Sequence, residues 1–223
     1  DCLRAQGQRR ARLSTLGDNN LPPSCGKEIE EGGVFLRAGK KAEIELPWHV
    51  GIYREDREDF TQICGGSLIS SDAVLSAAHC FWDDNHEKAH NKSRFRVAVG
   101  KYYRDWNIKE EGMQERELKE IIIHDGYRGR ARQFTNDVAI LKLEKPVNLT
   151  PEIVPVCYDS QTHLVDGDIG KVSHWGVNEQ NEWRKELIST QLPFVQFATC
   201  WNTIPQSFQQ FLTRDKFCAG YTN

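Results

Sequence analysis

Short segments in which apolar and polar residues alternate dominate this chain from residue 47 onward. Residues 94–100 place Phe95, Val97 and Val99 on one face, with the two-residue period of a half-buried strand. Similar β-branched segments, separated by Asp-Gly, Lys-Pro and glycine-containing turns, occupy residues 48–53, 121–123, 138–143, 171–173 and 191–195. The pattern predicts an all-β fold of antiparallel barrels or a sandwich.

Two stretches differ from this pattern. Residues 1 to about 33 are polar and rich in Arg, Asn, Gly and Pro, and we expect them to form a linker. Pro205 suits the first turn of a helix, and Phe208, Phe211 and Leu212 follow at helical spacing. This second stretch predicts a surface helix over residues 205–212.

The composition indicates a globular protein. The chain has 223 residues, of which 39% are hydrophobic, and its net charge of -3 with interspersed acids and bases gives no broad field for nucleic acid or membrane. It contains no apolar run of about 20 residues, the length that a bilayer span requires. Because the chain begins with Asp1 and no signal sequence precedes it, we expect an internal piece of a longer or processed precursor.

The cysteines and sequons fit an extracellular location. Seven cysteines without a Cys-x-x-C pair argue against a zinc ribbon and for disulfides formed in an oxidising compartment. Asn91-Lys92-Ser93 and Asn148-Leu149-Thr150 are N-glycosylation sequons, although Pro151 directly follows the second. We therefore expect a secreted glycoprotein.

A histidine beside a cysteine and a later aspartate supply candidate chemistry. A serine hydroxyl becomes a nucleophile when an imidazole accepts its proton and a carboxylate fixes the tautomer of that imidazole. His79 and Asp137 have the side chains for these two roles. Taken singly, His79 also fits a structural histidine and Asp137 a turn residue, and spacing does not decide between these interpretations.

Several motifs in register resemble the chymotrypsin-like, or trypsin-family, serine endopeptidases. The resemblance runs from about residue 34 to the end, and its motifs are Cys64-Gly65-Gly66-Ser67-Leu68, Ser76-Ala77-Ala78-His79-Cys80, Asn136-Asp137-Val138-Ala139-Ile140-Leu141, Trp175-Gly176 and Phe217-Cys218-Ala219-Gly220. It implies two antiparallel six-stranded β-barrels, with His79 as general base and then general acid and Asp137 as its orienting carboxylate. We expect a linker with the remnant of an upstream module at residues 1–35 and a protease domain at residues 36–223. The first barrel would span about 36–145 and the second, incomplete, about 160–223.

Further motifs, less specific than those above, resemble the modular serine proteases of arthropods, a branch that includes horseshoe-crab clotting-factor-like initiator proteases. They lie in residues 47–53, 100–105, 126–130 and 215–218. This likeness implies a zymogen that initiates an innate-immune or clotting-type cascade in a haemolymph-like fluid. Its partners would be upstream recognition modules, a downstream protease zymogen as protein substrate, and protease inhibitors, with no cofactor.

The same resemblance implies the disulfides and an activation cut. The pairs would be Cys64 with Cys80, Cys200 with Cys218, and Cys25 with Cys157. Cys2 is left over, as the partner of an upstream module or as a free thiol. Counting back from residues 47–48 places the activation cut between Phe35 and Leu36, whereas a cut after Arg37 leaves the new N-terminus out of register.

Three positions depart from the family pattern. Lys101 stands where many relatives have a Glu that begins a calcium loop, and we predict no calcium there because a cation repels Ca²⁺. His174 precedes Trp175 where relatives usually have Gly, and we expect a surface or packing histidine. The loop 81–93 is rich in Asp and His, but we expect a solvated loop and no metal site.

The chain also has no Gly-Asp-Ser-Gly-Gly motif, which supplies the serine nucleophile in this family. Ser67, Ser173 and Ser207 lie in motifs that correspond to other parts of the fold. We therefore expect the sequence of a serine endopeptidase that is truncated at its C-terminus and that, without the nucleophile, is inactive. The alternative is a non-catalytic protease homologue that serves as a binding or cofactor module; intact His79 and Asp137 favour the enzyme.

Overall fold

The computed structural model describes residues 4–5, 25–26, 35–37, 40–42, 46–57, 59–159 and 163–221. In these residues the chain is built mainly of strands, as the alternating pattern predicts. The strands are β1 Arg4–Ala5, β2 Phe35–Arg37, β3 Lys40–Ala42, β4 His49–Asp56, β5 Asp59–Ser70, β6 Ala73–Ser76, β7 Trp82–Asp83, β8 Lys88–Ala89, β9 Phe95–Val99, β10 Gln114–Ile123, β11 Ala139–Leu143, β12 Ile169–His174, β13 Ile188–Val195 and β14 Cys218–Ala219. The helices are α1 Phe197–Thr203 and α2 Gln206–Gln209, with 3-10 helices at Ala78–Phe81, Lys92–Arg94 and Gly129–Arg132.

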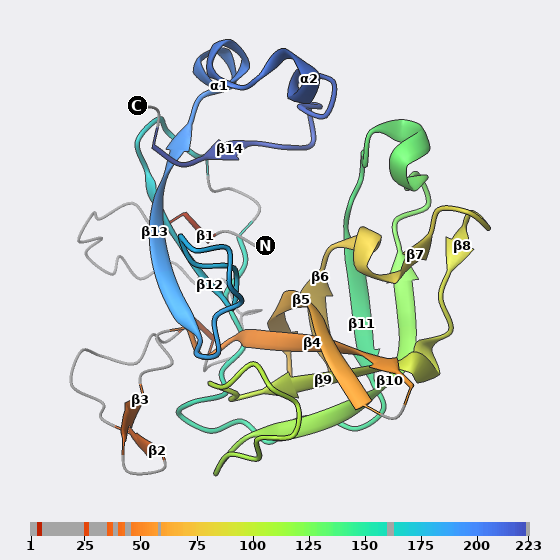
Figure 1. Cartoon of the computed structure of the whole chain (residues 1–223), viewed down its shortest axis with the longest axis vertical. Coiled ribbons are helices and arrows are strands. Elements are labelled where there is room, and N and C mark those ends of the chain that lie inside the picture. The colour runs from red at the N-terminus through yellow and green to blue at the C-terminus, as the bar shows by residue number, and fades with distance from the viewer. Residues whose placement is uncertain are drawn as a thin grey trace, which may run out of the picture.

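Six antiparallel strands close into a barrel in the order β10-β11-β6-β5-β4-β9 (Figure 1). The predicted strand at residues 94–100 is β9, and the side chains of Phe95, Val97 and Val99 are buried in the barrel core. The pairings β4-β5, β5-β6 and β10-β11 each contain a register shift. Such irregularities bend a strand and increase its local twist, which a small closed barrel requires.

Gly66, the second glycine of the Cys-Gly-Gly motif on β5, lies where a side chain has no room. A Cβ atom at this position would lie 2.8 Å from Val74 Cγ1 and 2.9 Å from the Leu75 carbonyl oxygen. No side chain fits there without displacing β6, the strand that leads to His79. Gly66 therefore allows the close approach of two strands that position the site.

Three strands from the second half of the chain and β1 from its N-terminal segment form a four-stranded sheet in the order β1-β12-β13-β14, beside the barrel in Figure 1. In the described residues this sheet is open rather than closed. Strand β1 pairs Arg4 with Lys171, although we expected a linker there. A strand of two residues has no periodicity that a sequence pattern can reveal.

The predicted helix over 205–212 is shorter than expected. It is α2, which begins after Pro205 and ends at Gln209. The amide N–H groups of Phe211 and Leu212 donate to carbonyls three residues earlier, so the chain tightens into turns in place of a longer α-helix. α1 has 7 residues, and no helix in the described part of the chain is long and apolar enough to cross a membrane.

Candidate active site

His79 lies at the exposed edge of the barrel, in the 3-10 helix Ala78–Phe81 that directly follows β6. The Cys64–Cys80 disulfide fastens this short helix to β5. The neighbouring side chains Ala78 and Phe81 are fully buried in the core, whereas the His79 side chain is 50% exposed. The local sequence therefore anchors the backbone on both sides of His79 and leaves its imidazole at the surface.

Asp137 reaches His79 through the pairing of β11 with β6. Ala139 is paired with Ser76, so the residues just before β11 and those just after β6 lie at the same end of the two strands. The Asp137 carboxylate accepts the His79 backbone N–H through Oδ1 at 2.8 Å and contacts His79 Nδ1 through Oδ2 at 2.7 Å. The fold thus joins two residues that are 58 positions apart.

The turn that carries Asp137 is held from the second half of the chain. Asn136 has a left-handed backbone with φ of 58°, and its N–H donates to Asp215 Oδ2 at 2.7 Å. Lys216 Nζ donates to the carbonyl of Gln133 at 3.4 Å. These contacts fix the backbone from which the Asp137 carboxylate projects.

The charge state of Asp137 follows from opposing effects. Burial favours its neutral form, but hydrogen bonds from the His79 ring and from the backbone N–H groups of His79 and Ala78 outweigh burial and lower its pKa. An ionised carboxylate accepts a proton-bearing Nδ1 and so leaves Nε2 of His79 as the basic nitrogen. An imidazole held in this way can act as a general base with a fixed tautomer.

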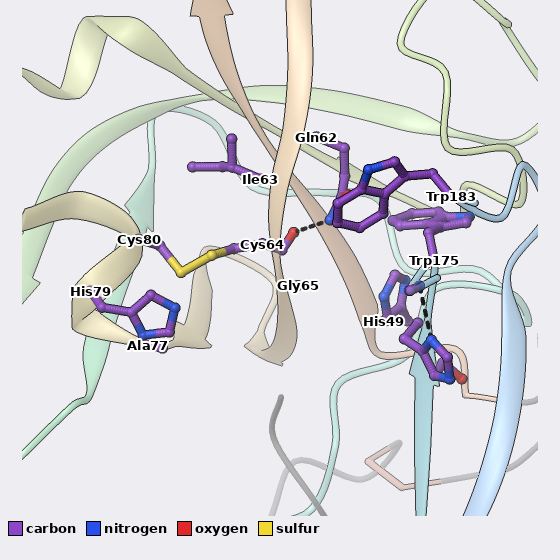
Figure 2. Close-up of a pocket in the computed structure, with 13 residues that line it drawn as sticks. His49, Gln62, Ile63, Cys64, Gly65, Ala77, His79, Cys80, Trp175 and Trp183 are labelled. Atoms are coloured by element: carbon purple, nitrogen blue, oxygen red, sulfur yellow. Dashed lines mark hydrogen bonds between the residues drawn. A yellow bond between two sulfur atoms is a disulfide. The ribbon is translucent and has the colours of Figure 1, made fainter. Parts of the chain in front are cut away.

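A hollow of about 280 Å³ lies beside His79, and we call it the catalytic hollow. Figure 2 shows His79 and the Cys64–Cys80 disulfide on one side of it and Trp175 and Trp183 on the other. The barrel and the four-stranded sheet both contribute to the lining: His49, Gln62, Ile63, Cys64, Gly65, Ala77, His79, Cys80, Ser173, His174, Trp175, Gly176 and Trp183.

A second histidine, His49, lines the catalytic hollow beside Trp175 (Figure 2). Its ring packs edge-on against Trp175 with a centroid distance of 4.8 Å. Burial, with a smaller contribution from the charge of His174, lowers the pKa of His49 to about 4. His174 accepts the Gly176 N–H at 2.9 Å through Nδ1, and burial lowers its pKa too, so burial favours the neutral form of both rings.

The serines named above do not meet His79. Ser173 lines the catalytic hollow, but its hydroxyl is hydrogen-bonded to Ser189 at 2.8 Å. Ser67 is paired with His49 and Leu75 inside the barrel sheet, and Ser207 is in α2. None of the three is placed as a nucleophile.

Lys101 fills the interior of the loop where a calcium site was considered. Its side chain is 0% exposed, and Nζ donates to the Ile108 carbonyl at 2.6 Å and lies 3.6 Å from Glu110 Oε1. Burial lowers the pKa of Lys101, an effect that the Glu110 carboxylate opposes. The Glu110 carboxylate also accepts the backbone N–H groups of Tyr102 and Tyr103. The Lys101 ammonium group thus lies inside the loop, close to the Ile108 carbonyl and the Glu110 carboxylate.

Contacts across the two halves of the molecule were not apparent from the sequence. The carbonyl of Tyr102 accepts both the Trp175 indole N–H and the Leu187 backbone N–H, each at 2.8 Å. These contacts attach the Lys101 loop to the wall of the catalytic hollow. Residues so far apart in the chain give no local pattern that would have shown this link.

The other predicted residues are placed as follows. The structure contains the Cys25–Cys157 and Cys200–Cys218 disulfides as well as Cys64–Cys80. Asn91 and Asn148 are exposed, and Phe35 and Leu36 lie in β2, which forms a hairpin with β3. Cys2 lies outside the described residues.

The acidic loop 81–93 does not gather metal ligands. His86 Nδ1 contacts Asp83 Oδ2 at 2.7 Å, while Asp84 accepts the Arg130 N–H at 3.2 Å. Over the described ranges, the one cluster of potential ligands is Cys64, His79 and Cys80. The disulfide uses both sulfur atoms, so this cluster offers no thiolate to a metal ion.

Comparisons with known proteins agree with this geometry. A family model described as Trypsin matches residues 37–223. Clotting factor C of Tachypleus tridentatus is 32% identical over 207 residues, and Limulus clotting factor C of Carcinoscorpius rotundicauda is 31% identical over 207; each alignment covers 89% of this chain and 20% of the relative. Modular serine protease of Drosophila melanogaster is 30% identical over 223 residues, with 97% of this chain and 33% of the relative covered. The chain therefore spans between a fifth and a third of the length of these curated relatives.

Proposed function

Because this chain belongs to the trypsin family of serine proteases, we propose that it is part of the protease domain of a secreted serine endopeptidase zymogen and carries the general base and its orienting carboxylate, but not the serine nucleophile. The contact of His79 Nδ1 with Asp137 Oδ2 at 2.7 Å carries the proposal. A non-catalytic homologue that serves only in binding has no chemical need for a half-exposed histidine with a fixed tautomer. The three disulfides further support an oxidising, extracellular compartment.

In this proposal His79 acts twice in an acyl-transfer reaction. Its Nε2 accepts the proton of a serine hydroxyl as the oxygen attacks the scissile carbonyl, and it then donates that proton to the leaving amine. Asp137 stays ionised and stabilises the imidazolium that forms between these steps. The substrate is a polypeptide held in the catalytic hollow.

The biological role that we propose is in a protease cascade of the innate-immune or clotting type. Two relatives are named clotting factors and one is named a modular serine protease. By analogy, upstream modules would receive the signal, and the downstream substrate would be another protease zymogen. Protease inhibitors would limit its action.

Activation would follow a cut between Phe35 and Leu36. The Cys25–Cys157 disulfide keeps the segment before this bond attached to the protease domain. N-terminal sequencing of the activated catalytic chain is expected to begin at Leu36. A chain that begins at Ala38 would refute this site.

The enzymatic proposal is tested on the activated full-length protein with a fluorophosphonate reagent, which labels an activated serine. Labelling is expected for the native protein and is expected to be lost in His79→Ala. His86→Ala is the matched control, because His86 also contacts an aspartate at 2.7 Å but lies outside the catalytic hollow. Asp137→Asn should reduce kcat by roughly ten-thousand-fold. A native protein that fails to label would support a non-catalytic binding protein instead.

A further inference from the structure

The turn that precedes Asp137 has a backbone that residues with side chains rarely adopt, and we call residues 133–136 the left-handed turn. Gln133, Phe134 and Asn136 have φ of 47°, 55° and 58°. Asn tolerates the left-handed region better than most residues, but for Gln and Phe this conformation is unfavourable. It therefore persists because contacts with the surrounding structure hold it in place.

The left-handed turn influences where the Asp137 carboxylate points. The Val138 N–H donates to the Asn136 carbonyl at 2.7 Å, which forms a three-residue turn centred on Asp137. The paired part of β11 begins at Ala139, after this turn. Asp137 thus lies between the barrel strand and the left-handed turn, so a shift of Asn136 would move the Asp137 carboxylate relative to His79.

Asp215 holds the left-handed turn from the second half of the chain. Its Oδ2 accepts the Asn136 N–H at 2.7 Å, although the two residues are 79 positions apart, and its Oδ1 accepts the Thr213 hydroxyl. Burial favours the neutral carboxyl, but hydrogen bonds from the Thr213 hydroxyl and the Asn136 N–H outweigh burial and lower the pKa of Asp215. The hydrogen bond from Asn136 is therefore charge-assisted, which is the stronger kind.

Two further contacts join the same parts of the chain. Lys216 Nζ donates to the Gln133 carbonyl at 3.4 Å and lies 3.6 Å from Asp215 Oδ2. The Phe134 ring contacts the Phe211 ring with a centroid distance of 6.1 Å. Each of the three residues with a positive φ is therefore contacted from the second half of the chain.

The segment that makes these contacts is itself anchored. Cys218, three positions after Asp215, forms a disulfide with Cys200 and pairs with Val195 of β13. Cys200 is buried at the end of this link, with 2% of its surface exposed. Asp215 thus projects from a part of the chain that is fastened to the four-stranded sheet, and its carboxylate can restrain the left-handed turn.

We propose that Asp215 is a positioning residue for the reaction, and that its carboxylate holds the left-handed turn where Asp137 keeps the proton of His79 on Nδ1. The importance of this restraint for catalysis rests on the proposed function, whereas its effect on the tautomer of His79 does not. The barrel supplies both members of the catalytic pair, and the second half of the chain aligns them. A residue that served only to stabilise its own loop would leave the tautomer unchanged.

The tautomer of His79 is measured first, because it requires no nucleophile. In ¹⁵N NMR of this chain, labelled at histidine and held at about pH 8.5, where histidine is ordinarily neutral, the nitrogen shifts report which ring nitrogen carries the proton. The signals of His79 are assigned by their loss in His79→Gln. We expect the proton on Nδ1 in the native chain, and we expect Asp215→Ala to shift the major form to the proton on Nε2.

Two variants separate positioning from a general loss of structure. Asp215→Asn keeps an oxygen acceptor for the Asn136 N–H and should retain the proton on Nδ1. Asp166→Ala is the matched control, because the Asp166 carboxylate also accepts a distant backbone N–H, that of Gln196 at 2.9 Å, but ties the segment before β12 to the start of α1.

The native tautomer in a folded Asp215→Ala protein, or the same change of tautomer in Asp166→Ala, would overturn the proposal. If Asp215→Ala does not fold, Asp215→Glu replaces it, because this variant keeps the charge and displaces the carboxylate by one methylene. Its fraction of His79 with the proton on Nε2 is expected to rise above that of the native chain, and an unchanged fraction would likewise overturn the proposal.

Kinetics of the activated full-length protein then test whether the alignment matters for catalysis. With a short chromogenic substrate, Asp215→Ala should lower kcat about a hundredfold, the typical cost of a misplacement of about 1 Å, while KM changes little and Asp215→Asn keeps most of the rate. An unchanged kcat, or an effect confined to KM, would overturn the positioning role. A native protein that does not hydrolyse the substrate would overturn the proposed enzyme, and the NMR would still decide whether Asp215 positions the pair.

Discussion

Lys101→Met is expected to destabilise the first barrel more than a typical surface substitution. In the native protein the ammonium group is completely buried, donates to the Ile108 carbonyl and lies 3.6 Å from the buried Glu110 carboxylate. Methionine has a similar length but cannot donate a hydrogen bond. The substitution would leave the negative charge of Glu110 buried without its cation, which typically costs about 3–5 kcal/mol.

The thermal shift follows from the size of the domain. At about 2–4 °C per kcal/mol, the melting temperature should fall by roughly 6–20 °C in a circular dichroism scan. Lys119→Met removes an exposed lysine from β10 and is expected to change the melting temperature little. Lys101→Met/Glu110→Gln should be more stable than Lys101→Met alone, because the double variant buries no uncompensated charge.

The result that would refute this reasoning is a Lys101→Met protein within about 0.5 kcal/mol of the native one, as the Lys119→Met control is expected to be. A double variant that is no more stable than Lys101→Met would separately show that the charge of Glu110 is not the cause.

Three further predictions concern pH, calcium and glycans. The pKa of His49 falls from 6.5 to about 4 on folding, so the unfolded chain binds more protons than the folded one between these pH values. The free energy of unfolding should therefore decrease by about 3 kcal/mol as the pH falls through this range. In urea unfolding, His49→Gln should flatten this pH dependence, whereas His86→Gln, at an exposed position, should not. Adding Ca²⁺ should leave the melting temperature unchanged, because the Lys101 ammonium occupies the loop; a clear rise would contradict that account. In protein secreted from eukaryotic cells, Asn91→Gln and Asn148→Gln should each reduce the mass by one glycan, and an unaltered mass would rule out that sequon.

Local pattern was enough to predict β4, β9, β11 and the end of β10, since period-two alternation is a direct consequence of burying one face, but the predicted segments did not include β5 or β6. β9 is the plainest case, because Phe95, Val97 and Val99 all point into the core. α1 was not expected: Phe197 and Trp201 stack with centroids 5.9 Å apart and are partly exposed, so its apolar face has no clear boundary. The helix is instead fastened to β14 by the Cys200–Cys218 disulfide, a long-range constraint.

The candidate site required information beyond local pattern. His79 and Asp137 were assigned through family motifs, and the structure supplies the physical reason for their proximity in the β6-β11 pairing. The contact of Phe60 on β5 with Trp106 was not predicted, because the two residues belong to separate segments of the chain. Sequence periodicity reports on burial within one element, whereas such a contact depends on how different elements meet.

The Cys25–Cys157 disulfide has a topological consequence. Its two cysteines are 132 positions apart and enclose every strand of the closed barrel in a covalent ring. By the chain-entropy relation, such a ring restricts the unfolded ensemble enough to contribute about 5 kcal/mol to stability. A cut between Phe35 and Leu36 would open the ring while both pieces stayed joined, so the disulfide would become a tether between two chains. Activation at that bond would therefore restore conformational freedom to the unfolded chain, while the segment before the cut stayed attached.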